Sequence, residues 1–83
     1  MNDCLITFRS VTPAQRGESV LRRGGYKCSI RRTPKWMEEQ GCGYSLHLNA
    51  RDVQGAVQLL RKAQLPFRKI YVWQGGDAEE LTL

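Results

Sequence analysis

The fold is indicated most clearly by residues 44–60, YSLHLNARDVQGAVQLL, in which one hydrophobic pattern gives way to another. Side chains alternate between apolar and polar over residues 44–48, and this period of two predicts a half-buried strand. From Val53 onward the apolar residues recur at i, i+3, i+4 and i+7, the spacing of an amphipathic helix. Asn49 stands between the two patterns and can cap the helix. The stretch therefore predicts a strand followed at once by a helix.

A similar strand–helix unit comes earlier in the chain. Residues 4–8 form a short apolar, β-branched run typical of a strand. Thr12-Pro13 predicts the start of a helix, and Gly24-Gly25 predicts its left-handed end. Two more strands are expected, an alternating one at 26–32 and a closing one at 67–73. The resulting order predicts an α+β fold, a ferredoxin-like βαββαβ sandwich whose four-stranded antiparallel sheet carries two helices on one face.

Length and composition indicate one small domain. The chain has 83 residues, of which 41% are hydrophobic and 25% are charged, as in ordinary globular proteins. We expect a single domain over residues 1–74 and an acidic flexible tail over residues 75–83. No apolar stretch reaches the roughly 20 residues that a membrane-spanning helix needs. A large catalytic cleft with a lid is excluded by size.

Charge and cysteine usage indicate the setting. Thirteen Lys and Arg against eight Asp and Glu give a net charge of +5, and three of the acids lie in the last seven residues. A basic body attracts nucleic acid, anionic cofactors or acidic proteins. The start, Met1-Asn2-Asp3-Cys4, lacks the basic region of a secretory signal. Three cysteines without Cys-x-x-Cys spacing fit a reducing compartment, so we expect a cytoplasmic protein.

Cys42 is the leading candidate for chemistry. Gly41 and Gly43 leave its thiol without side-chain cover and free the backbone to turn amides toward a sulfur anion. The alternative is a tight turn in which a cysteine is merely tolerated. Cys4 and Cys28 fall at inward positions of the strand patterns and are expected to be small buried hydrophobic residues.

Nearby cations favour the reactive form of this thiol. Arg31, Arg32 and Lys35 lie close in sequence and can stabilise a thiolate. A short helical turn over residues 34–40 would oppose them, because Cys42 would then follow the negative end of its dipole.

The same connector holds two large apolar residues. Trp36 and Met37 either cover the edge of the core or form an exposed patch that docks a partner protein. Among other candidates, His47 is expected to face solvent on the open side of the sheet. No pair of Cys and His residues has chelating spacing, so no metal site is predicted.

RNA binding is an alternative function. Basic domains of this topology stack bases on aromatic side chains of their two central strands. The expected third strand, 44–48, matches that aromatic-rich signature poorly. A protein-interaction module without thiol chemistry is the other alternative.

Several segments together resemble a known family. They are a first strand of the Leu5-Ile6-Thr7-Phe8 type, the tripeptide Arg32-Thr33-Pro34, a spacer leading to Cys42-Gly43, and a closing Ile70-Tyr71. With these features the chain resembles, from Leu5 to Trp73, a family of short bacterial proteins described as Se/S carrier-like.

The resemblance implies a carrier that holds sulfur or selenium on Cys42 as a persulfide or selenopersulfide. Its partners would be the donor and acceptor proteins, which Arg31, Arg32 and Lys35 would contact if those proteins are acidic. A carrier of this kind is not a turnover enzyme and needs no cofactor. Neither nucleic acid nor a membrane is an expected partner, and no oligomer is implied.

Overall fold

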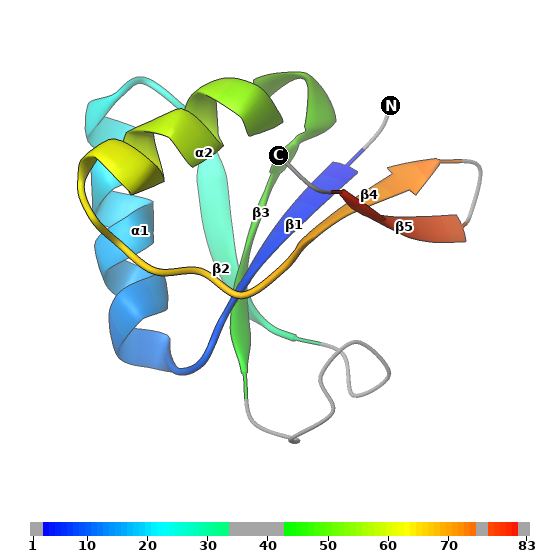
Figure 1. The fold of residues 1–83 in the computed structure, drawn as a ribbon, viewed down its shortest axis with the longest axis horizontal. Coiled ribbons are helices and arrows are strands. Elements are labelled where there is room, and N and C mark those ends of the chain that lie inside the picture. Colours follow the sequence, from blue (N-terminus) through cyan, green and yellow to red (C-terminus); the bar gives the residue numbers. More distant parts are fainter. Residues whose placement is uncertain (1–2, 34–42, 75–76, 82–83) are drawn as a thin grey trace.

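The computed structural model describes residues 3–33, 43–74 and 77–81 of the chain (Figure 1). In chain order the elements are β1 (Asp3–Phe8), α1 (Val11–Arg23), β2 (Cys28–Arg32), β3 (Tyr44–Asn49), the 3-10 turn η1 (Ala50–Asp52), α2 (Val53–Lys62), β4 (Ile70–Gln74) and β5 (Asp77–Leu81). Both helices lie on the same side of the sheet in Figure 1.

The five strands form one antiparallel sheet in the order β2-β3-β1-β4-β5. The predicted α+β class is confirmed, and β1 to β4 with the two helices keep the predicted βαββαβ order. The predicted four-stranded sheet is wrong in its number of strands, because residues 77–81, expected in the acidic tail, pair with β4. This segment, DAEEL, has little strand propensity of its own, so its conformation depends on the pairing.

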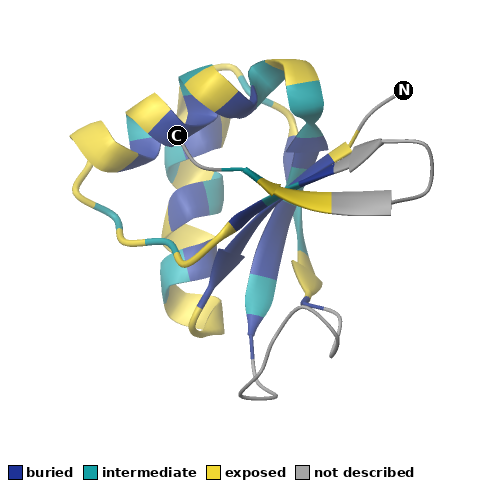
Figure 2. Cartoon of the chain, turned by 45° about the vertical axis from the view of Figure 1, so that its right-hand side comes forward, coloured by how far each residue is buried: buried dark blue, intermediate teal, exposed yellow. Residues whose placement is uncertain are grey.

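The hydrophobic core lies between the helices and one face of the sheet, where Figure 2 shows the buried residues gathered. Alternate residues of the strands point into it, as a period of two requires. Its fully buried side chains include those of Cys4, Ile6, Phe8, Leu21, Leu46 and Leu60. α1 approaches the sheet closely at Gly17, where an added Cβ would lie 3.0 Å from both Leu46 Cδ1 and Phe8 Cζ.

The helix boundaries follow the sequence signals with one exception. Asn49 caps η1, the 3-10 turn that leads into the predicted helix, since its side chain accepts a hydrogen bond from the Arg51 N–H at 3.2 Å; the N-cap of α2 itself is Asp52. The predicted end of α1 is also confirmed: Gly24 is its C-cap and Gly25 has a φ of 89°. The start is not at Thr12. α1 begins one residue earlier, at Val11, and its N-cap is Ser10, whose backbone is extended.

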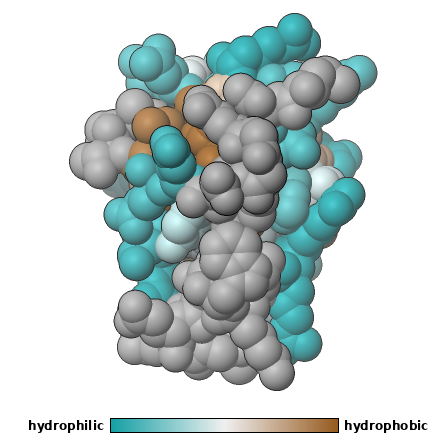
Figure 3. All heavy atoms as spheres, turned by 90° about the vertical axis from the view of Figure 1, so that its right-hand side faces the viewer, coloured by the Kyte–Doolittle hydropathy of each residue, from teal (hydrophilic) through white to brown (hydrophobic). Residues whose placement is uncertain are grey.

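The surface of the described part of the chain is mainly polar. On the side seen in Figure 3, hydrophilic side chains flank the molecule and a smaller hydrophobic area lies in its upper part. Within residues 3–33, 43–74 and 77–81, no helix has the length and apolar character needed to cross a bilayer.

Candidate functional site at the β2–β3 hairpin

The predicted site residues belong to one hairpin, formed by β2, β3 and the connection between them. Gly43, Arg31 and Arg32 are described by the structure. Five of the predicted residues lie outside the described part of the chain: Lys35, Trp36, Met37, Gly41 and Cys42. The expected helical turn at 34–40 lies outside it as well. What the structure defines is therefore the base of the connection.

That base is closed by a backbone hydrogen bond. The Thr33 N–H donates to the Gly43 carbonyl oxygen at 3.0 Å, which extends the β2–β3 ladder by one pair beyond Arg32 and Tyr44. Both Thr33 and Gly43 are buried. Gly43, the residue that follows Cys42 in the sequence, is thus held at the start of β3. The connection of residues 34–42 begins and ends on neighbouring strands.

Thr33 is a buried polar residue that the sequence pattern did not reveal. Its pairing with Pro34 looks like a helix-capping signal, yet the residue ends the described part of the hairpin. Its side chain is 6% exposed, and its Oγ1 has no hydrogen-bond partner among the residues that the structure describes. Strand alternation gives no signal for its burial either, because Arg31, on the same strand face, is exposed.

Arg31 and Arg32 are both exposed, but they do not form one cluster. Successive residues of a strand point to opposite faces, so Arg31 lies on the face away from the helices and Arg32 on the other. The charge of Arg31 acts on His47, which is also on the face away from the helices. Only one of the two guanidinium groups therefore lies on any given side of the hairpin.

Further cations lie at the same end of the sheet. Arg9 follows β1, and Arg68 and Lys69 precede β4, the strand on the other side of β1. All three are exposed, and the Lys69 Nζ lies 3.7 Å from the Glu80 Oε1. The end of the sheet from which the connection leaves is consequently basic, as a docking surface for acidic proteins would be.

The predicted burial of Cys4 and Cys28 is confirmed, at 0% and 8% exposure. Burial raises the pKa of the Cys4 thiol to about 12. The pKa of the Cys28 thiol is raised by burial and by the charge of Glu18, against the smaller lowering effect of Arg22. Both thiols are therefore protonated at neutral pH, and a protonated thiol is a poor nucleophile.

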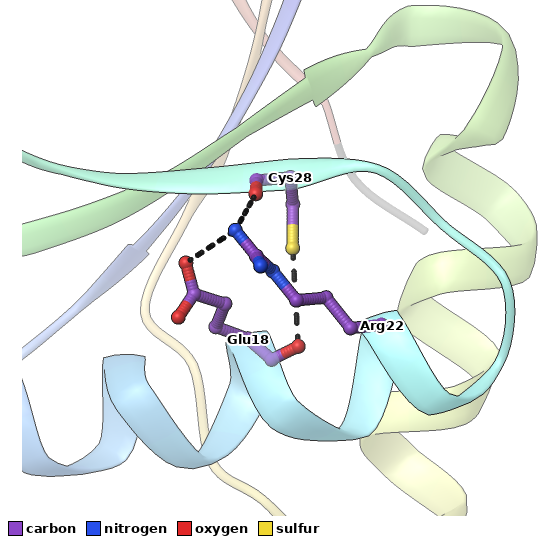
Figure 4. Close-up of polar contacts among 3 residues, drawn as sticks. All are labelled: Glu18, Arg22 and Cys28. Atoms are coloured by element: carbon purple, nitrogen blue, oxygen red, sulfur yellow. Dashed lines mark hydrogen bonds and ion pairs between the residues drawn. The ribbon is translucent and has the colours of Figure 1, made fainter.

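Cys28 sits in a set of polar contacts that ties α1 to β2 (Figure 4). The Arg22 Nη2 donates to the Cys28 carbonyl oxygen at 3.2 Å and lies 3.4 Å from the Glu18 Oε2. The Cys28 Sγ lies 4.0 Å from the Glu18 carbonyl oxygen. The guanidinium thus joins the backbone of Cys28 to the side chain of Glu18, and the contacts hold α1 against β2.

His47 lies on the predicted face, away from the helices, but the expectation of a solvent-facing side chain is wrong. The residue is half-buried, and its Nε2 is buried with no hydrogen-bond partner within the described residues. Burial and the charge of Arg31 lower its pKa, and Asp3 opposes them weakly. The imidazole is therefore neutral at pH 7.

The face of the sheet away from the helices is closed around the central strands. Leu5 and Ser45 are fully buried there, and Thr7 is 3% exposed. The Thr7 Oγ1 accepts from the Lys69 N–H at 2.9 Å, and the Ser45 Oγ donates to the Arg31 carbonyl oxygen at 3.3 Å. None of these residues of β1 and β3 is aromatic, and the aromatic residue described on this face, Tyr71, lies on β4, so the central strands do not show the stacking residues of an RNA-binding sheet. Among the residues described, no three His, Cys, Asp or Glu side chains come together as a metal site.

The architecture and the hairpin define a small α+β domain whose candidate chemistry lies on the connection between the edge strand β2 and its neighbour β3. Comparison with family models makes this specific: the chain belongs to the family described as "Putative Se/S carrier protein-like", which matches residues 3–72. The resemblance found in the sequence is thereby confirmed. Comparisons with curated proteins and with solved structures gave no match.

Proposed function

We propose that the protein carries sulfur or selenium on Cys42 between a donor and an acceptor protein. The observation that carries the proposal is the family match, which runs over the whole hairpin and includes residue 42. The burial of the other two cysteines supports it, since neither of those thiols is available for exchange at neutral pH.

The reaction is a thiol exchange. The Cys42 thiolate attacks the outer sulfur of a donor persulfide, R–S–SH; the new S–S bond forms as the donor S–S bond breaks, and the donor leaves as R–S⁻. The proton of the outer sulfur stays in place, giving Cys42–S–SH. A thiolate of the acceptor then attacks the same outer sulfur and releases the Cys42 thiolate. A selenium cargo follows the same steps with an outer selenium atom.

The chain's own contribution is electrostatic and positional. Arg31 and Arg32 flank the base of the connection, and Lys35 lies within it, so these cations would favour ionisation of Cys42 and attract acidic partners. Trp36 and Met37 would supply apolar contact area. The protein acts as a carrier in a reducing compartment, the cytoplasm, and its turnover depends on the two partner proteins.

Persulfide loading tests the proposal directly. The protein is incubated with a cysteine desulfurase and cysteine, and its intact mass is measured without reductant. The expected result is a gain of one sulfur atom in the wild type and in Cys28→Ala, and no gain in Cys42→Ser. Loading that persists in Cys42→Ser, or no loading of the wild type by sulfur or selenium donors, would overturn the proposal.

A further inference from the structure

β2 is the outermost strand on its side of the sheet, and its hydrogen-bonding direction can be deduced. In an antiparallel ladder, hydrogen-bonded pairs alternate with pairs that are not hydrogen-bonded. The bond from the Thr33 N–H to the Gly43 carbonyl oxygen marks one bonded pair. Two residues back, Arg31 faces Ser45 in the register and forms the next bonded pair. The residues in between must then turn their N–H and C=O groups away from β3.

Those residues are Cys28, Ile30 and Arg32, and an independent contact confirms their direction. The Cys28 carbonyl oxygen accepts a hydrogen bond from the Arg22 Nη2, on the side away from β3 (Figure 4). Beyond it, the outward groups of Ile30 and Arg32 receive no backbone hydrogen bond from residues 3–33, 43–74 or 77–81. The outer edge of β2 therefore presents two N–H and two C=O groups in the spacing of one more strand.

The surroundings of this edge are positively charged. Arg31 and Arg32 of β2 and Lys27, which precedes it, are exposed, and Arg22 and Arg23 end the neighbouring α1. The opposite outer strand, β5, is acidic instead, with the sequence DAEEL. An extended segment that adds to a sheet gains affinity from backbone hydrogen bonds and specificity from its side chains. Because the side chains around this edge are basic, we expect the added segment to be acidic.

We propose that the outer edge of β2 binds an extended acidic segment of a partner protein as an additional strand. Backbone hydrogen bonds at Ile30 and Arg32 hold the segment, and its carboxylates pair with Lys27, Arg31 and Arg32. β2 runs directly into the connection that holds Cys42, so a strand added there ends at the base of that connection. That the partner is a donor or acceptor of sulfur or selenium rests on the proposed function. The addition of a strand to β2 rests only on the backbone geometry and the charges of this edge.

The test uses amide hydrogen exchange by NMR with a synthetic eight-residue peptide in which pairs of valines alternate with pairs of glutamates, so that carboxylates lie on both faces of the added strand. In the free protein, the amides of Ile30 and Arg32 exchange fast, and those of Ser29 and Arg31 are protected by β3. At saturating peptide, exchange at Ile30 and Arg32 slows by about tenfold or more, since their N–H groups become bonded. The same peptide with every backbone nitrogen methylated, and a valine–lysine peptide, leave the exchange unchanged.

Two variants of one residue separate charge from backbone pairing. Arg32→Gln removes the charge and keeps the outward N–H. Arg32→Pro removes both and leaves the ladder to β3 intact, because proline is tolerated in an edge strand where the N–H faces outward. We expect Arg32→Gln to weaken peptide binding about threefold at low salt and Arg32→Pro to weaken it about tenfold or more. An amide spectrum of Arg32→Pro that keeps the β3 signals shows that the fold is retained.

Three results would overturn the proposal. One is equal binding by Arg32→Pro and Arg32→Gln without protection at Ile30. Another is protection of Ile30 that grows with protein concentration in the absence of peptide, which would assign the edge to a second copy of the chain. The third is protection by an oligouridylate and not by the peptide. Cys42→Ser binds the peptide like the wild type, so failure of persulfide loading and failure of strand addition are observed separately.

Discussion

Burial of the Cys4 thiol keeps it protonated in the folded protein, and for this reason the stability of the fold decreases at alkaline pH. Its pKa is about 12 in the folded protein against an ordinary value of 9.0, so between these values only the unfolded chain loses the proton. The stabilisation is complete below pH 9 and is lost as pH rises toward 12. From pH 8 to pH 10 this thiol should lower the free energy of unfolding by about 1.4 kcal/mol. Urea unfolding at both pH values, in wild type and Cys4→Ala, measures the difference; equal pH dependence in both would contradict it.

At this scale, strand periodicity predicts the face on which a side chain lies but not what covers that face. The inward positions of Cys4 and Cys28 follow from alternation and are confirmed. His47 lies on the predicted face, yet it is half-buried, because its exposure depends on tertiary neighbours. Arg31 and Arg32 are neighbours in the sequence and are therefore predicted to act together on one thiol, but strand alternation places their side chains on opposite faces of the sheet. The role of Cys42 stays a prediction.

Among the elements, α1 packs closely against the sheet at Gly17. An added Cβ would lie 3.0 Å from Leu46 Cδ1 and Phe8 Cζ, and both side chains are fully buried and have little room to move. Gly17→Ala should therefore destabilise the protein by about 1–2 kcal/mol, even though alanine has the higher helix propensity. Ser19→Ala, on the exposed side of the same helix, is the matched control and should change stability by less than about 0.5 kcal/mol. Chemical denaturation of both variants checks this; a Gly17→Ala protein as stable as the wild type would show that α1 can shift.

Elements with strong local patterns were predictable, and those that depend on pairing were not. The alternation at 44–48 and the helical spacing from Val53 correspond to β3 and α2, because local periodicity and burial agree there. The segment Asp77–Leu81 has no such pattern, and its strand exists through its register with β4. α1 begins at Val11 and not after Thr12, a shift of the size that helix ends commonly show.

In the whole molecule, a basic body carries an acidic edge strand, β5. Removing residues 77–83 deletes three acids, which raises the formal net charge from +5 to +8. It also removes β5 and the packing of Leu81 against the core. The change in net charge and the loss of β5 can each alter the free energy of unfolding, and one control variant separates the two effects.

We expect the truncation to lower the free energy of unfolding by about 1–3 kcal/mol, a large part of the 4–12 kcal/mol that is typical of a chain of roughly this length. The control is the triple variant Asp77→Asn, Glu79→Gln, Glu80→Gln, which makes the same change in charge and keeps the strand. If β5 stabilises the sheet through pairing and Leu81, thermal unfolding of the triple variant stays within a few degrees of the wild type and that of the truncated protein falls well below it. Equal losses in the two would instead assign the stabilisation to the acidic charges facing the basic body.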